Sequence, residues 1–134
     1  MSETYMNEPG DERSRDNLMR LVVLESPYQG EVGENVEYAQ QCLLDCLERG
    51  EAPIASHLLF PAILDDWEPH QRGIGLNAGR AWIRACDAMV VYCDRGVSKG
   101  MHQAIGCARI WGKPIEYRRL GPLPELNDGA GINE

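Results

Sequence analysis

The chain has 134 residues, of which 43% are hydrophobic and 25% are charged, as in a typical single globular domain. Its formal net charge of −8 argues against nucleic-acid polymers as partners. No apolar run approaches the ~18 residues of a membrane span, so we expect no membrane partner. The polar start does not resemble a signal peptide, and we therefore expect a cytoplasmic protein.

Acidic and basic residues are separated along the chain. Residues 20–68 hold ten acidic residues against two basic ones, whereas residues 69–119 hold nine basic residues against three acidic ones. The basic half therefore fits a small anionic ligand better than a polyanion, although a solvated surface explains most such imbalances.

The cysteines and histidines predict neither a disulfide framework nor a metal site. Five cysteines are an odd number, and none forms a CxxC pair, so we expect reduced, buried thiols. His70 and His102 lack partners at metal-ligand spacing. We expect no cofactor, because the chain has neither a GxxxxGK[ST] motif nor a GxGxxG motif after a strand.

Short apolar runs alternate with helical patterns along the chain. The expected strands are Leu21–Leu24, Ala52–Ala55, Ala88–Tyr92 and Lys113–Tyr117. The expected helices span about Glu34–Glu48, Gln71–Ala85 and Ser98–Trp111, and His57–Pro69 reads as a loop with one helical turn. We place one domain at residues 18–120, between a disordered tail at 1–17 and a flexible tail at 121–134.

Apolar spacing predicts the inward face of each helix. The predicted inward residues are Val36, Ala39, Leu43 and Cys46 or Leu47 in the first helix, Ile74, Ala78, Ala81, Trp82 and Ala85 in the second, and Met101, Ile105, Ala108 and Trp111 in the third. Three glycines weaken the second helix and make its start uncertain.

Strands that alternate with helices at this spacing imply an α/β fold. We expect a small, doubly wound parallel sheet of four or five strands, flavodoxin-like or Rossmann-like, with helices on both faces. Ligands in such sheets bind beyond the carboxyl ends of the strands, where residues 26–30, 56–66 and 94–100 should converge. Because the sheet is small, we also expect a homo-oligomer that covers exposed helix faces.

The turn between the third strand and the third helix is the most informative segment. Gly96 and Gly100 flank it, and Ser98 is placed to cap the helix. Such a junction offers free backbone N–H groups and a positive dipole end to an anion. The Ser98 hydroxyl and the Lys99 ammonium group are therefore candidates to bind a phosphate.

Three segments carry a resemblance to a known family. They are Leu24-Glu25-Ser26-Pro27-Tyr28-Gln29-Gly30, then Ala55-Ser56-His57-Leu58-Leu59-Phe60-Pro61 with Leu64-Asp65-Asp66, and then Cys86-Asp87 through Gly112-Lys113-Pro114. In this order and spacing they resemble the nucleoside 2-deoxyribosyltransferase-like superfamily, and within it small phage and bacterial members. Relatives include the deoxynucleoside 5′-monophosphate N-hydrolases.

The resemblance implies cleavage of an N-glycosidic bond by a glutamate in the first turn of the last main helix, since an oxocarbenium-like centre needs an adjacent carboxylate. Aligned on Ser98 and Gly100, that glutamate falls on Ala104. Either alanine is a plain helix residue in a branch without this chemistry, or it is a deliberate Glu→Ala change that traps bound substrate. In both cases the chain as written is expected to be a poor catalyst.

Other site residues follow from the same resemblance. The aspartate that related hydrolases keep before the third strand is missing here, and Asp94, Asp65 or Asp66 are candidates to replace it. By its place at the end of the second strand, and not by the resemblance, His57 is a candidate acid or base or a residue that recognises the nucleobase, and a buried, hydrogen-bonded histidine is the alternative. The candidate substrate-binding residues are Ser26, Pro27, Tyr28, Gly30, Ser98, Lys99, Gly100 and Met101.

Three functions stay open from the sequence. The first is an N-glycosidase that releases free base from a nucleoside 5′-monophosphate, or from a nucleotide immune signal such as a cyclic dinucleotide in a phage counter-defence role in the host cytoplasm. Its acceptor is either water or a second base, and its sites would lie near subunit interfaces. The second is a non-catalytic nucleotide sponge or sensor, and the third is an interaction domain without a small ligand.

Overall fold

The computed structural model describes residues 19–121. The expected tail at 1–17, and the expected tail at 121–134 beyond its first residue, lie outside the described residues. The elements in chain order are β1 (Arg20–Glu25), α3 (Val32–Glu48), β2 (Glu51–Ile54), α4 (Ser56–Leu59), α5 (Pro69–Ala85), β3 (Ala88–Tyr92), α6 (Lys99–Ile110) and β4 (Ile115–Arg118).

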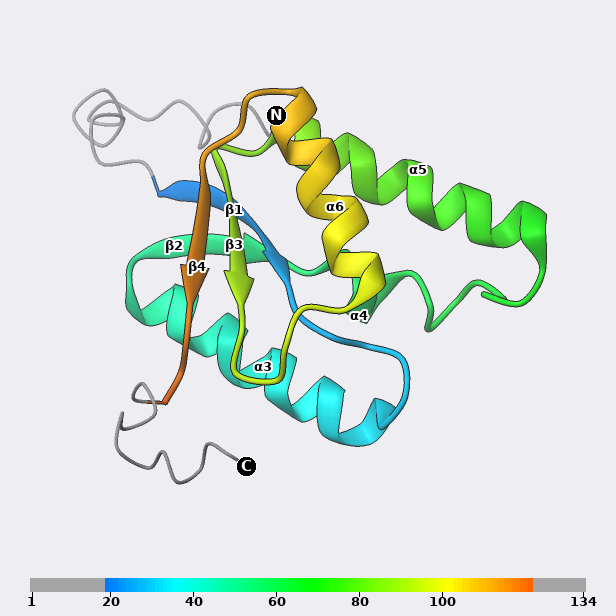
Figure 1. The fold of residues 1–134 in the computed structure, drawn as a ribbon, viewed down its shortest axis with the longest axis horizontal. Helices are drawn as coiled ribbons and strands as arrows, with labels where there is room; N and C mark the ends of the chain where they lie inside the picture. Colours follow the sequence, from blue (N-terminus) through cyan, green and yellow to red (C-terminus); the bar gives the residue numbers. More distant parts are fainter. Residues whose placement is uncertain (1–18, 122–134) are drawn as a thin grey trace, which may run out of the picture.

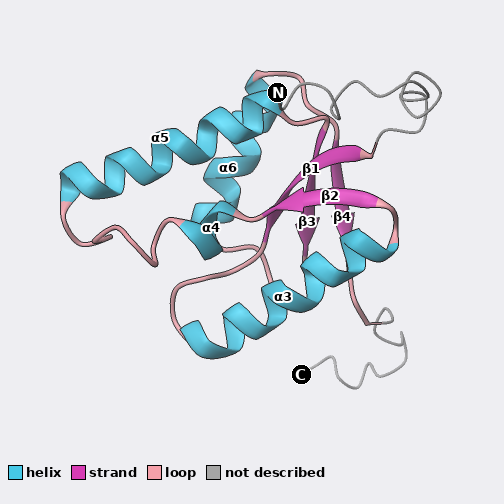
Figure 2. Ribbon diagram, turned by 180° about the vertical axis from the view of Figure 1, so that it is seen from behind, coloured by secondary structure: helices cyan, strands magenta, loops and turns pink. Residues whose placement is uncertain are grey.

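The strands form one parallel sheet in the order β2-β1-β3-β4. Helix α3 covers one face of the sheet, and α5 and α6 cover the other (Figures 1 and 2). The expected small α/β fold, with a doubly wound parallel sheet and helices on both faces, is therefore confirmed. Within residues 19–121 the sheet has four strands, the lower of the two expected numbers.

Alternating side chains of β1 divide the core into two clusters. Val22 and Leu24 pack with the buried residues of α3, whereas Val23 packs with those of α5 and α6. Since successive strand residues point to opposite faces, Glu25 continues the α5–α6 side, one step beyond Val23. The register of the strand therefore directs a carboxyl group toward the end of an apolar cluster.

The inward face of α3 is only partly the expected one. Ala39 and Cys46 are buried and Leu43 packs against the core as expected, but Asn35, Tyr38 and Cys42 are buried too, and Leu47 is 52% exposed. Polar side chains can lie on this buried face because they find hydrogen-bond partners there. Asn35, for example, donates from its amide to the carbonyl oxygens of Tyr28 and Gln29, both at 3.1 Å.

The expected apolar stripe of α5 is also wrong. Ile83 is the one buried residue of this helix, and Ile74 and Trp82 are almost half exposed. The inward face instead carries Gly79 and Gly75, one and two turns before Ile83. A Cβ at Gly75 would meet Leu64 Cδ1 at 3.3 Å, and a Cβ at Gly79 would meet Ser56 Oγ at 3.2 Å. These glycines let α5 approach the α4 segment closely.

In α6 the expected stripe is mostly confirmed. Met101, Ile105 and Ala108 are buried, but Trp111 follows the helix end and is exposed. Ser98 caps the helix as expected, because its hydroxyl accepts a hydrogen bond from the Met101 backbone N–H at 3.3 Å.

A buried ion pair joins the two outer strands across the α3 face. Arg118 of β4 donates to both carboxylate oxygens of Glu51 of β2, at 2.8 and 2.7 Å. The two side chains are only 6% and 9% exposed. Arg118 also donates to the Tyr92 hydroxyl at 3.2 Å. The hydrogen bond from Arg118 lowers the pKa of the Glu51 carboxyl despite its burial.

All five cysteines are free, and Cys42, Cys46 and Cys86 are buried. None of the helices in residues 19–121 combines the length and the apolar composition that crossing a membrane requires.

Candidate functional site

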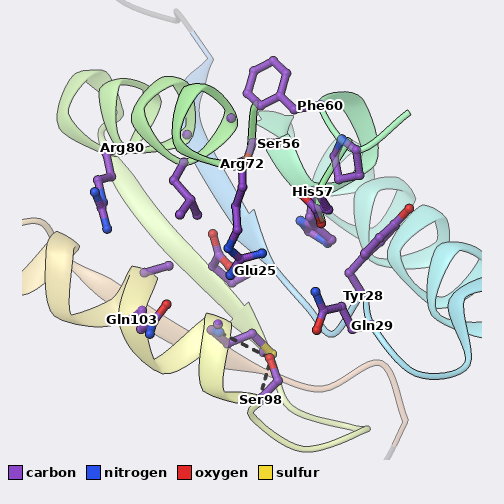
Figure 3. Close-up of a pocket in the computed structure, with 18 of the residues that line it drawn as sticks. Glu25, Tyr28, Gln29, Ser56, His57, Phe60, Arg72, Arg80, Ser98 and Gln103 are labelled. Carbon is purple, nitrogen blue, oxygen red and sulfur yellow. Dashed lines mark hydrogen bonds between the residues drawn. The ribbon is translucent and has the colours of Figure 1, made fainter. Parts of the chain in front are cut away.

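A cavity of about 420 Å³ lies at the carboxyl end of β1, where residues that follow β1, β2 and β3 meet α5 and α6 (Figure 3). We call it the strand-end pocket. Its lining residues are Glu25, Ser26, Tyr28, Gln29, Ser56, His57, Phe60, Pro61, Leu64, Asp66, Arg72, Gly75, Leu76, Gly79, Arg80, Ile83, Ser98, Lys99, Gly100, Met101, Gln103, Ala104 and Cys107.

Most of the candidate residues from the sequence come together here. The structure brings nine of them to the pocket wall: Ser26, Tyr28, His57, Asp66, Ser98, Lys99, Gly100, Met101 and Ala104. Pro27, Gly30 and Asp94 are not among the lining residues. Pro27 is buried, and Gly30 has the positive φ of 96° that the turn before α3 requires.

Asp94 does not line the pocket, and its carboxylate instead holds neighbouring segments of the chain together. Its carboxylate accepts hydrogen bonds from the Tyr38 hydroxyl at 2.7 Å and from the backbone N–H groups of Leu120 and Gly121. Burial alone would raise the pKa of Asp94, but these hydrogen bonds outweigh burial and lower it. The carboxylate thus stays ionised and fully engaged where the chain leaves β4.

Glu25 is the residue that sequence reasoning missed most clearly. It ends β1, lines the pocket and lies at the centre of the close-up, where the end of the Arg72 side chain overlaps it in this view (Figure 3). No hydrogen bond or ion pair reaches its side chain from within residues 19–121, and burial raises the pKa of its carboxyl to about 8. The sequence did offer one sign of this residue: Glu25 directly follows four apolar residues of a strand, at a position where a buried strand would continue with another apolar residue.

Ser26 and His57 form a hydrogen-bonded pair in the pocket wall. The Ser26 Oγ and His57 Nε2 atoms lie 2.8 Å apart, and His57 Nδ1 is buried without a partner in the described part of the chain. Burial lowers the pKa of His57 to about 4, so the imidazole is neutral at pH 7. The Tyr28 ring meets His57 edge-on, with ring centroids 6.4 Å apart.

Three cationic side chains face the cavity. Arg72 and Arg80 project from α5, and Lys99 begins α6 next to the backbone N–H groups of its first turn. Figure 3 shows Arg72 reaching down into the pocket and Arg80 at its far end. At pH 7 Glu25 and His57 are largely uncharged, so Asp66 is the one described lining residue that opposes these cations. The pocket therefore favours an anion.

Arg72, Arg80 and Gln103 line the pocket from outside the segments that were predicted to converge there. Gln29, Ser56 and Phe60 lie within those segments but were not named as candidates. Arg72 and Arg80 belong to the basic half of the chain, which was the only sequence sign of their role. Residues 19–121 contain no group of three His, Cys, Asp or Glu side chains that could hold a metal ion.

Comparison with solved structures identifies proteins of similar fold. A 2-deoxyribosyltransferase from Bacillus psychrosaccharolyticus aligns with a TM-score of 0.57 and 20% identity, covering 80% of this chain and 78% of that one. A 2-desoxiribosyltransferase from Leishmania mexicana aligns with a TM-score of 0.50 and 18% identity, covering 83% and 71%. The CMP N-glycosidase BcmB from Clostridium botulinum aligns with a TM-score of 0.47 and 19% identity, covering 84% and 81%.

The chain therefore shares its fold with the two deoxyribosyltransferase structures. Comparison with curated proteins finds no similar sequence. A family model described as "Domain of unknown function (DUF7768)" matches residues 20–118, which include every strand and helix of the described structure. The chain therefore belongs to the DUF7768 family.

Proposed function

We propose that the strand-end pocket binds a small nucleotide and that the protein cleaves its N-glycosidic bond, releasing the free base. The observation that carries the proposal is the convergence of Arg72, Arg80 and Lys99 on one cavity at the strand ends. A nucleotide phosphate needs such cations, and its base and sugar need the mixed apolar and polar wall that Phe60, Tyr28 and their neighbours supply. The fold shared with 2-deoxyribosyltransferases supports the same chemistry.

The size of the cavity favours one nucleotide unit over two. About 420 Å³ lies at the lower end of the ~300–1,000 Å³ that small-molecule sites occupy. A nucleoside 5′-monophosphate is therefore the preferred substrate class, and a cyclic dinucleotide serves as the alternative in the test. Water as acceptor would make the protein a hydrolase, and a second base would make it a transferase.

Ala104 favours a second candidate function. It lines the pocket on α6, at the position where the family resemblance implies a glutamate. If that glutamate is indispensable, the chain is either an inactivated form that traps substrate or a non-catalytic nucleotide sponge or sensor.

Binding and base release separate these candidates. The chain as given and its Ala104→Glu variant are incubated with nucleoside 5′-monophosphates and cyclic dinucleotides, and free base is measured by chromatography. We expect both forms to bind a monophosphate and to release its base, the unchanged chain more slowly than the glutamate form. Tight binding by both forms without release would favour the sponge, and no binding by either would contradict both candidates.

Substitutions of the arginines in the pocket, with a matched control on the same helix, test the phosphate site. Arg72→Gln and Arg80→Gln should each weaken nucleotide binding about tenfold or more, because each removes a charge-assisted contact to the phosphate. Arg84→Gln lies on the same helix but does not line the pocket, so it should leave the dissociation constant unchanged. Equal effects of all three would contradict a phosphate site at this place.

A further inference from the structure

The carboxyl group of Glu25 lines the strand-end pocket, and the family resemblance assigns it no role. Its place follows from the strand register: Glu25 points to the α5–α6 side, beyond Val23, and ends at the cavity. It has no hydrogen bond or ion pair within residues 19–121, unlike Asp94, whose carboxylate is fully engaged. A half-buried acid at the wall of a cavity, without a partner from within those residues, points to a role in function.

The surroundings of Glu25 keep its proton in place. Ile83 and Met101 are buried members of the α5–α6 cluster, Ala104 and Cys107 pack against that cluster, and all four line the same pocket. Arg72, Arg80 and Lys99 line the same pocket and favour the carboxylate, but burial beside these apolar side chains outweighs them and raises the pKa of Glu25 to about 8. The group can therefore donate a proton near pH 7.

The identity of residue 104 fits this arrangement. A glutamate at position 104 would place a second carboxyl group in the same partly apolar pocket, where ionisation of one carboxyl group makes ionisation of the other more costly. With alanine there, Glu25 and Asp66 are the carboxyl groups that line the pocket within the described residues. Asp66 comes from the loop before α5, whereas Glu25 lies at the end of a buried central strand, which holds it more rigidly.

We propose that Glu25 is the general acid of this pocket, and that it protonates the nucleobase as the base leaves the sugar. This inference rests on the proposed function. The C1′–N bond breaks with its electron pair passing to the base, and the Glu25 proton is transferred to the base. Water adds through its oxygen to C1′ and loses one proton, which returns to the Glu25 carboxylate through solvent. One water is consumed, and the products are the free base and the sugar phosphate with a hydroxyl at C1′.

The test uses the full chain with Glu25→Gln, which replaces the acid by a neutral group of the same shape. Base release from nucleoside 5′-monophosphates is measured across the pH range. We expect Glu25→Gln to release base about 10²–10⁴-fold more slowly than the unchanged chain. Its nucleotide dissociation constant should change no more than about threefold, which shows that the variant is folded. Glu37→Gln, an exposed glutamate of α3, is the matched control and should leave the rate unchanged.

The pH profile separates proton donation from a merely structural role. Because the acid must be protonated, the rate of the unchanged chain should fall above pH 8, by about tenfold per pH unit, and Glu25→Gln should lose this dependence. A rate for Glu25→Gln within tenfold of the unchanged chain would overturn the assignment while leaving the proposed function intact. Base release by Ala104→Glu, with none from the unchanged chain, would likewise overturn the assignment of Glu25 and leave the proposed function intact. Failure of every form to bind or cleave a nucleotide would overturn both proposals.

Discussion

At the scale of single residues, Glu25 and His57 depart from their ordinary pKa values in opposite directions for the same reason. Burial disfavours the charged form of each, so it raises the pKa of Glu25 from 4.5 to about 8 and lowers the pKa of His57 from 6.5 to about 4. The stabilisation linked to Glu25 is complete below pH 4.5 and is lost as the pH rises through 8. The stabilisation linked to His57 is complete above pH 6.5 and is lost as the pH falls through 4.

A pH-dependent stability follows from these two residues. Between pH 4.5 and 6.5 their effects oppose one another, whereas from pH 6.5 to 8 Glu25 acts alone. The free energy of unfolding should therefore fall as the pH rises from 6.5 to 8, by at most about 1.4 kcal/mol per pH unit. Urea unfolding at several pH values measures this slope. Glu25→Gln should flatten it and Glu37→Gln should keep it, so parallel slopes for all three forms would refute the explanation.

At the scale of elements, the glycines of α5 separate helix propensity from close packing. A Cβ at Gly73 would have no atom within 4 Å, whereas a Cβ at Gly79 would meet Ser56 Oγ at 3.2 Å. Both lie inside α5, where alanine is favoured over glycine. The two positions thus form a matched pair.

Gly73→Ala should raise the free energy of unfolding by about 0.5–1 kcal/mol, because it removes flexibility from the unfolded chain without a clash. Gly79→Ala should raise the free energy of unfolding by less than this, or lower it, because the Ser56 side chain must shift. Gly79→Ala should also weaken nucleotide binding, because Gly79 and Ser56 both line the pocket. Thermal unfolding and a binding titration measure the two effects. An equal gain in stability for both variants would mean that α5 does not depend on this contact.

The order and type of the elements could be predicted because strand length and helical period are local properties. Helix faces were harder: α5 turns glycines inward, and a search for large apolar residues cannot see them. Asp94 was a reasonable candidate by its place after β3, but its partners Tyr38 and Leu120 are distant in sequence. Glu25 was missed because the protonation of an acid depends on neighbours that only the folded chain brings together.

At the scale of the whole molecule, the buried pair of Arg118 and Glu51 ties together the two edges of the sheet. Arg118→Met would leave the Glu51 carboxylate buried without its main partner. The free energy of unfolding should fall by about 3–5 kcal/mol. Arg49→Met removes an exposed ion pair with Asp45 and should cost less than about 1 kcal/mol. Chemical denaturation of both variants measures the difference, and similar losses would show that the buried pair has no special weight.

The division of charge along the chain has a kinetic consequence. Residues 69–119 build α5 and α6 and supply Arg72, Arg80 and Lys99, so an acidic protein of net charge −8 presents a positive field at its pocket. An anionic ligand is repelled by most of the surface and attracted at one place, which steers its diffusion toward productive encounters. Added salt screens both effects, since the Debye length is about 10 Å at 0.1 M. The association rate, more than the residence time, is then the quantity that ionic strength controls.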